Sequence, residues 1–191
     1  MNEIGFNYEV TDPAPGLMIA ADGTLHIAAS DTSSEHDFDF LMGEHLVYHR
    51  KLKVRLSNCT EWVEFEGGHE MKKILRGTAN IEKYNLQASG GKPLDGMNLR
   101  LFDPLTRLWS IYWADSIEGR LSLPVIGSFE KGVGHFYAAD TCNGIAVIIL
   151  FRYDGVTNKE PTWSQAFSAD YGKTWEWNWQ MIYKDHSNES A

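Results

Sequence analysis

Polar side chains that could contact a small molecule stand within runs that otherwise read as apolar strands. Arg100 lies between Leu99 and Leu101, and Arg152 ends the apolar run 145–151. A buried guanidinium is costly without a partner. Each of these Arg side chains therefore points to solvent, pairs with an Asp or Glu, or meets an anionic ligand group inside a cavity. The sequence leaves these alternatives open.

Histidines form the second group with chemical potential, because the imidazole titrates near neutral pH. His45 and His49 lie four residues apart on one face of a predicted strand, about 13 Å from each other. Two ligands of one metal on a single strand normally lie two residues apart, so this spacing does not favour zinc. A single haem-binding His cannot be recognised from sequence. We predict no metal ligand and no cofactor, and the sequence leaves a haem held by one His as an open alternative.

Two aromatic strands add further candidates. In the run 175–181, a face of three Trp and one Met alternates with Glu176, Asn178 and Gln180. One of the two faces of such a strand must look into a barrel, and a polar inward face suits a ligand cavity. Trp113 belongs to a second aromatic run, 108–115. We therefore include Trp113 and Asn178, together with Gln165, among the residues that can face a ligand.

Motifs of common enzyme classes do not occur in the chain. It contains no H-E-x-x-H, no G-x-S-x-G, no Walker loop and no dinucleotide fingerprint. The segment 168–175 fits S-x-D-x-G-x-T-W, which resembles the Asp-box of sialidases, and predicts a structural hairpin turn. No catalytic residue is therefore predicted.

Composition narrows the class of protein further. The chain has 191 residues, with 43% hydrophobic and 13% aromatic residues, enough for one domain with a sizeable core. A formal net charge of −9 argues against nucleic acid and anionic membranes as partners. No apolar run reaches the ~18 residues of a membrane span. Two isolated cysteines and an acidic N-terminus predict a cytoplasmic protein with free thiols.

Short strands separated by Gly, Asn and Asp turns predict an all-β protein. About ten strands follow from Glu44 onward, which indicates a single antiparallel barrel or sandwich. The first is a long strand, Glu44 to Leu56, and a short helical turn in 37–42 precedes it. An Asp-Gly pair at 22–23 predicts a small hairpin. We divide the chain into an N-terminal arm (1–36), a barrel domain (37–186) and a tail (187–191).

The segment 38–45, FDFLMGEH, resembles the F-D-F-[WL]-x-G-x-W opening of a bacterial family of calycin-like β-barrels of unknown function. The resemblance covers about 37–184 and continues in the segments 47–52, 99–104, 109–113, 165–170 and 175–179. More distantly, the opening is similar to that of lipocalins, fatty-acid-binding proteins and haem-binding nitrobindins. The resemblance implies a cup-shaped barrel with a ligand inside. His45 stands where the family has a Trp, which makes the barrel floor smaller and more polar.

The resemblance and simple alternation disagree about the first strand. Alternation predicts that Leu46 and Tyr48 are buried, together with Leu52, Val54 and Leu56, and that the odd positions are exposed. The resemblance instead implies that His45 points to the barrel floor. A β-bulge near His49 to Lys51 would reconcile the two, because it exchanges the faces of a strand.

Our leading hypothesis is a lipocalin-like barrel that binds a small, partly apolar molecule in its interior. The candidate ligand-binding residues are His49, Arg100, Trp113, Arg152, Gln165 and Asn178. One alternative is an enzyme in which His49 acts as acid or base and Arg100 holds an anionic substrate. Another is an interaction module that forms a homodimer through its N-terminal arm.

Overall fold

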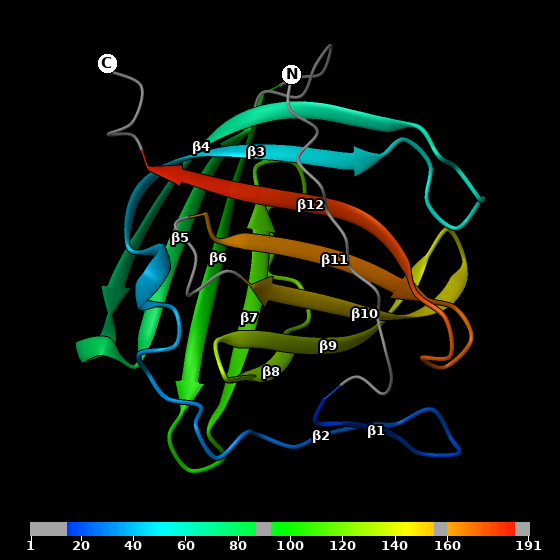
Figure 1. Ribbon diagram of the computed structural model, residues 1–191, viewed down its shortest axis with the longest axis horizontal. Helices are drawn as coiled ribbons and strands as arrows, with labels where there is room; N and C mark the ends of the chain where they lie inside the picture. The colour runs from blue at the N-terminus through cyan, green and yellow to red at the C-terminus, as the bar shows by residue number, and fades with distance from the viewer. Residues whose placement is uncertain (1–14, 87–92, 155–159, 186–191) are drawn as a thin grey trace.

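The computed structural model describes residues 15–86, 93–154 and 160–185. Within these residues ten antiparallel strands close into a barrel, and two short strands form a separate hairpin (Figure 1). The all-β prediction is confirmed. The strands are β1 (Leu17–Ile19), β2 (Leu25–Ile27), β3 (Gly43–Leu52), β4 (Trp62–Ile74), β5 (Ala79–Leu86), β6 (Leu94–Asp103), β7 (Leu108–Asp115), β8 (Val125–Glu130), β9 (Val133–Cys142), β10 (Ile145–Asp154), β11 (Thr162–Ser168) and β12 (Glu176–Asp185).

Consecutive strands are neighbours all the way around the barrel, and β12 returns to pair with β3. Tight turns make this meander possible. Asn143 and Gly144 both have positive φ, 51° and 80°, between β9 and β10. Such a pair matches the twist of a two-residue hairpin, and Asn and Gly adopt it with little strain.

One end of the barrel is closed by a single 3-10 turn, η1 (Asp39–Leu41), which enters β3 through Gly43. Gly43 has a φ of +99°, which favours glycine. Phe38 precedes the turn, and its ring packs edge-on against Trp109, Phe129 and Tyr153, with centroids 5.0, 5.0 and 5.1 Å away. The short helical turn predicted before the first strand is confirmed, and it forms the plug at this end of the barrel.

The inner face of β3 carries its histidines. His45, Val47 and His49 are buried, whereas Leu46 and Tyr48 are half-buried on the outer face. The expectation from simple alternation is therefore wrong for Leu46 and Tyr48, because polar side chains occupy the interior here. The orientation that the family resemblance implies for His45 is the observed one.

Two further details of the first strand differ from expectation. The strand ends at Leu52, not at Leu56, and Leu56 and Asn58 adopt positive φ in the following loop. Its pairing with β4 and β12 continues in register along the whole described strand, so the bulge expected near His49 does not form.

A bulge lies instead between β11 and β12. The register shifts at Gln165 and Ala166, which leaves Asn178 as the extra residue. Trp177 consequently packs outside the barrel and Trp179 inside it. The face of three Trp expected from alternation is thus split between the two sides of the sheet.

The predicted hairpin at residues 22–23 is confirmed as β1 and β2. It lies against the outside of the barrel, where Leu17, Leu25 and Ile27 cover an outer apolar cluster that includes Tyr137 and Leu150. It is the blue segment at the bottom of Figure 1. The Tyr137 hydroxyl also donates a hydrogen bond of 3.3 Å to the carbonyl of Pro15. The described part of the arm, residues 15–36, therefore folds back onto its own barrel.

Replacing the plug residue should weaken the fold strongly. We expect Phe38→Ala to lower the free energy of unfolding by about 3–5 kcal/mol, because it removes a buried ring and leaves a cavity. Urea unfolding followed by fluorescence measures the change. Leu105→Ala is the control, since Leu105 is 93% exposed and its replacement should leave the midpoint unchanged. Equal midpoints for Phe38→Ala and wild type would contradict the plug role.

Candidate functional site

A cavity of about 700 Å³ occupies the half of the barrel away from η1. Aromatic side chains from several strands make its walls: Tyr84, Trp113, Phe151, Tyr153, Trp163 and Trp179. The segment 116–124 between β7 and β8 and the end of β9 form its mouth. Cavities of about 300–1,000 Å³ with mostly apolar walls are typical small-molecule sites.

Trp113 is held in the wall by a glycine on the neighbouring strand. A Cβ added to Gly96 would lie 2.1 Å from the indole ring, so only glycine leaves room for it. The indole N–H donates to Asp115 Oδ2 at 3.0 Å. The other carboxylate oxygen accepts the backbone N–H groups of Ile117 and Glu118 at the start of the mouth segment. Asp115 thereby fixes both the wall and the mouth of the cavity.

His49 lines the cavity and is only 3% exposed. Its ring stacks on Phe65, with centroids 4.6 Å apart and planes 6° apart, and its Nδ1 accepts the Trp179 indole N–H at 3.3 Å. Nε2 is buried and has no hydrogen-bond partner within the described part of the chain. Burial, helped by the charges of Lys51 and His69, lowers the pKa of His49 to about 3. The ring is therefore neutral at physiological pH.

Arg100 points into the barrel but does not line the cavity. Its guanidinium is fully buried, pairs with Glu82, and donates to Tyr153 Oη and Asn80 Oδ1, both at 3.2 Å. It also lies 4.5 Å above the ring of Phe38. The guanidinium therefore contacts other residues of the same chain, beneath the cavity floor and next to the plug.

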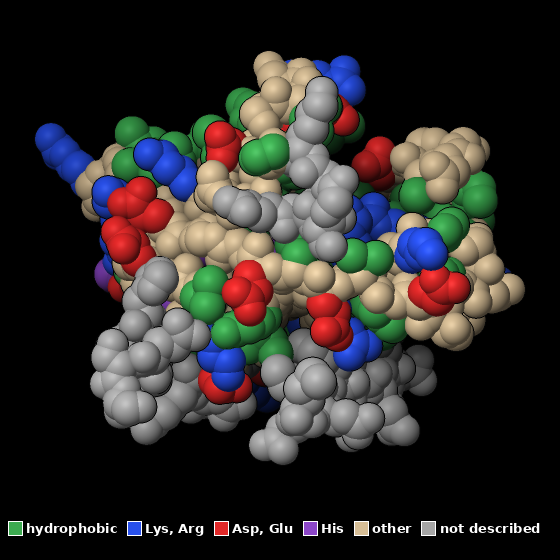
Figure 2. Space-filling view, turned by 90° about the horizontal axis from the view of Figure 1, so that it is seen from above, with side chains coloured by type: hydrophobic (Ala, Val, Ile, Leu, Met, Phe, Trp, Pro, Cys, Tyr) green, Lys and Arg blue, Asp and Glu red, His purple; other side chains and the backbone are tan. Residues whose placement is uncertain are grey.

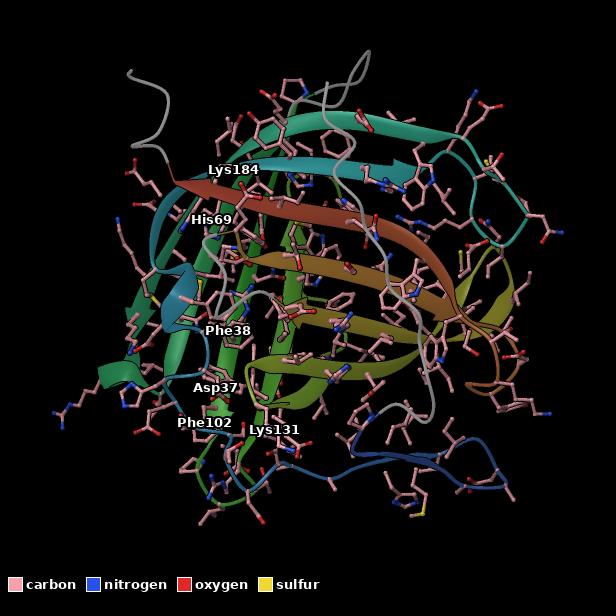
Figure 3. All side chains as sticks on the ribbon, in the orientation of Figure 1. Asp37, Phe38, His69, Phe102, Lys131 and Lys184 are labelled. Atoms are coloured by element: carbon pink, nitrogen blue, oxygen red, sulfur yellow. The ribbon has the colours of Figure 1, made fainter. Side chains whose placement is uncertain are left out.

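The pair of Glu82 and Arg100 belongs to a larger buried group, which we call the ion network: His45, His69, Glu82, Asn98 and Arg100. Its links are His45 Nδ1 to His69 Nδ1 (3.2 Å), His69 Nε2 to Glu82 Oε1 (2.8 Å) and Asn98 Nδ2 to Glu82 Oε2 (2.6 Å). Figure 3 shows His69 and Phe38 on the η1 side of the barrel. The network lies in the part of the interior next to the plug, and its Asn98 also lines the cavity.

Electrostatics in the network keep Glu82 ionised. Burial alone would raise the pKa of this carboxyl, but Arg100, His69 and Asn98 outweigh it and lower the pKa to about 2. Burial likewise disfavours the charge on Arg100, yet the Glu82 carboxylate raises the arginine pKa above its usual range. The two charges therefore exist together inside the barrel.

The other residues predicted from the sequence to bind a ligand are Gln165, Asn178 and Arg152, and they differ in whether they line the cavity. Gln165 lines the cavity, and its amide donates to Asn178 Oδ1 at 2.7 Å. Asn178 is fully buried at the bulge and does not line the cavity. Arg152 lies on the outer face of β10 and donates to Asp154 at 2.7 Å. The structure thus brings His49, Trp113 and Gln165 together and leaves Arg152 outside.

Sequence reasoning missed Glu82 and His69. Glu82 shares the inward face of β5 with Tyr84 and Leu86, so the alternation of that strand was the available signal. His69 shares a face of β4 with Phe65 and Met71, and Glu64, Glu66 and Glu70 lie on the other face, so alternation was the available signal there too.

Two basic side chains, those of Lys51 and Arg55, lie beside Trp179. Lys51 Nζ lies 4.2 Å from the centre of the Trp179 ring, and the Arg55 guanidinium lies 5.9 Å from it. Burial, together with the charge of the nearby Arg55, lowers the pKa of Lys51 to about 8. Elsewhere on the surface, Figure 2 shows Lys and Arg side chains scattered among Asp and Glu on the face in view.

Comparison of the sequence with protein-family models and with curated proteins gave no match. Within the described ranges, no helix has the length and apolar character needed to cross a membrane. Nor do those ranges contain a group of three or more His, Cys, Asp or Glu that could hold a metal ion. The fold and the cavity are therefore the basis for assigning a function.

Breaking the buried ion pair should destabilise the barrel. We expect Arg100→Met to cost about 3–5 kcal/mol of unfolding free energy, because Glu82 then stays buried without its counter-ion. Adding Glu82→Gln should recover part of the loss, since a neutral amide removes the uncompensated charge. Urea unfolding measures both, with Lys53→Met at a surface pair as the control that should leave the midpoint unchanged. No loss in Arg100→Met would contradict the assigned role.

The buried neutral imidazole predicts a pH effect on stability. Between the ordinary His pKa near 6.5 and the folded value of about 3, the unfolded chain binds a proton at His49 and the folded chain does not. Stability therefore falls as pH falls through this window, by about 1.4 kcal/mol per pH unit from this residue. Comparing wild type with His49→Phe by urea unfolding at pH 6, 5 and 4 isolates the contribution. Parallel pH curves for the two proteins would contradict it.

Proposed function

We propose that this protein is a calycin-like binding protein that holds one small, partly apolar molecule inside its barrel. The observation that carries the proposal is the cavity of about 700 Å³, whose aromatic walls surround a single buried and unpartnered imidazole nitrogen of His49. Polar side chains that also line it, among them His49, Asn98 and Gln165, would orient a ligand, while the rings supply apolar contact area.

The shape of the interior supports binding at one end only. Phe38 and the ion network fill the half next to η1, whereas the cavity reaches the mouth formed by the segment 116–124. Three exposed apolar side chains belong to that segment: Ile117, Leu121 and Leu123. A molecule with apolar surface would enter past these side chains.

The enzyme alternative receives less support from the site. His49 and Arg100 both point into the barrel, as that hypothesis requires, but Arg100 is bound to Glu82 and does not reach the cavity. The depressed pKa of His49, about 3, makes its neutral ring a weak base and leaves almost no imidazolium to act as an acid near pH 7.

Dimerisation through the arm receives less support as well. The apolar side chains of β1 and β2 already cover the outer cluster of their own barrel. Met18, on the opposite side of β1, is 64% exposed, and one such residue is ordinary for a protein surface.

A residue that fills the cavity should abolish binding. We expect the wild type to bind one 8-anilinonaphthalene-1-sulfonate molecule with enhanced fluorescence, and Ala138→Trp, in the cavity wall, to weaken this at least about tenfold. Ala146→Trp is the matched control, since Ala146 is exposed on the outside of β10. Native mass spectrometry of protein from its own host would identify a retained molecule. Equal dye affinities in the two variants, or no binding by the wild type, would contradict the proposal.

A further inference from the structure

We propose that the Nε2–H group of His49 anchors the ligand, and that the ligand offers it an acceptor oxygen from a flat, otherwise apolar body. This inference rests on the proposed function and specifies the class of ligand. It follows from three features of His49: the tautomer of the ring, the buried and unpartnered Nε2 of a residue that lines the cavity, and the neutral state of the ring.

The tautomer follows from the indole of Trp179. Its N–H donates to Nδ1 of His49, so the lone pair of Nδ1 is in use and the neutral ring carries its proton on Nε2. Stacking on Phe65 fixes the plane of the ring. In this tautomer Nε2 offers a proton and no lone pair, so it suits an acceptor atom and does not suit a metal.

A buried N–H group without a partner is unfavourable, because it has lost its bond to water. Nε2 of His49 is such a group within the described residues. A ligand oxygen in the cavity would restore the missing bond. The gain is available only to a ligand with an acceptor, which makes this position a source of specificity.

Gly67 faces the His49 ring from β4. A Cβ at this position would clash with Leu86 Cδ2 at 2.8 Å and with the Asn85 carbonyl oxygen at 2.9 Å, whereas its distance of 3.4 Å from Nε2 is an ordinary contact. The adjacent Gly68 has nothing within 4 Å of its corresponding position. Glycine at 67 therefore lets β4 pack closely against Leu86 next to the His49 ring.

The surroundings of His49 keep its ring neutral, so it can donate to a neutral or an anionic oxygen. Burial acts most strongly against a positive charge on the ring, and Lys51 on β3 and His69 on β4 act in the same direction. They leave the imidazole as a neutral N–H donor. A ketone, an ester or a carboxylate would all satisfy Nε2, and the flat walls formed by Trp113 and Trp163 suit an aromatic body.

The test compares three probes of one shape: 2-ethylnaphthalene, 2-acetylnaphthalene and 2-naphthoate. Equilibrium dialysis measures their affinities for the wild type, His49→Phe and His49→Gln. We expect at least one oxygen-bearing probe to bind the wild type about tenfold more tightly than the hydrocarbon. The preference should fall below about twofold in His49→Phe and persist in His49→Gln, whose amide can both accept from Trp179 and donate to the ligand.

Comparing probes within each variant separates the lost donor from any change in fold, because all three probes meet the same protein. Binding of all three with equal affinity to the wild type would overturn the inference and leave the proposed function standing. So would an oxygen preference that survives in His49→Phe. Failure of every probe to bind below about 1 mM would overturn both. The ketone and the carboxylate probes separate the two sources of the acceptor oxygen.

Discussion

The buried ion pair between Glu82 and Arg100 is the constraint on which the rest of the interior depends. Two opposite charges without access to water must stay together and must have their remaining hydrogen bonds satisfied. His69, Asn98, Asn80 and Tyr153 provide most of those bonds, and Arg100 Nε is left without a partner within the described residues. Each of these side chains comes from a strand of the barrel, so the pair fixes how several strands face one another.

This constraint also divides the interior of the barrel into two halves. Phe38 packs against the Arg100 guanidinium, so the plug at the closed end and the ion network support each other. What remains empty is the other half, where rings surround the cavity. Tyr153 belongs to both halves, because its hydroxyl accepts from Arg100 while its side chain lines the cavity. A ligand in the cavity would therefore contact a floor that the ion pair of Glu82 and Arg100 holds rigid.

Local signals in the sequence were sufficient for the strands, the hairpin at residues 22–23 and the helical turn before β3, since these depend on turn chemistry and alternation. These local signals did not decide which face of each strand points into the barrel. Alternation assigns apolar residues to the interior, and it failed for Leu46 and Tyr48 because this barrel buries histidines. The partner of Arg100 was not predictable either, since Glu82 becomes its neighbour only through the register of β5 and β6.

Closure of the barrel also sets the order in which the chain can fold. The second edge of β3 is paired only when β12 has been added to the sheet. β12 lies near the far end of the described chain. During synthesis on the ribosome, the edge of β3 that pairs with β12 therefore emerges long before its partner. Until then the nascent chain exposes an unpaired strand, which is a template for pairing with other chains. Completion of the cavity and protection from aggregation thus come in the same final step, when the last strand docks.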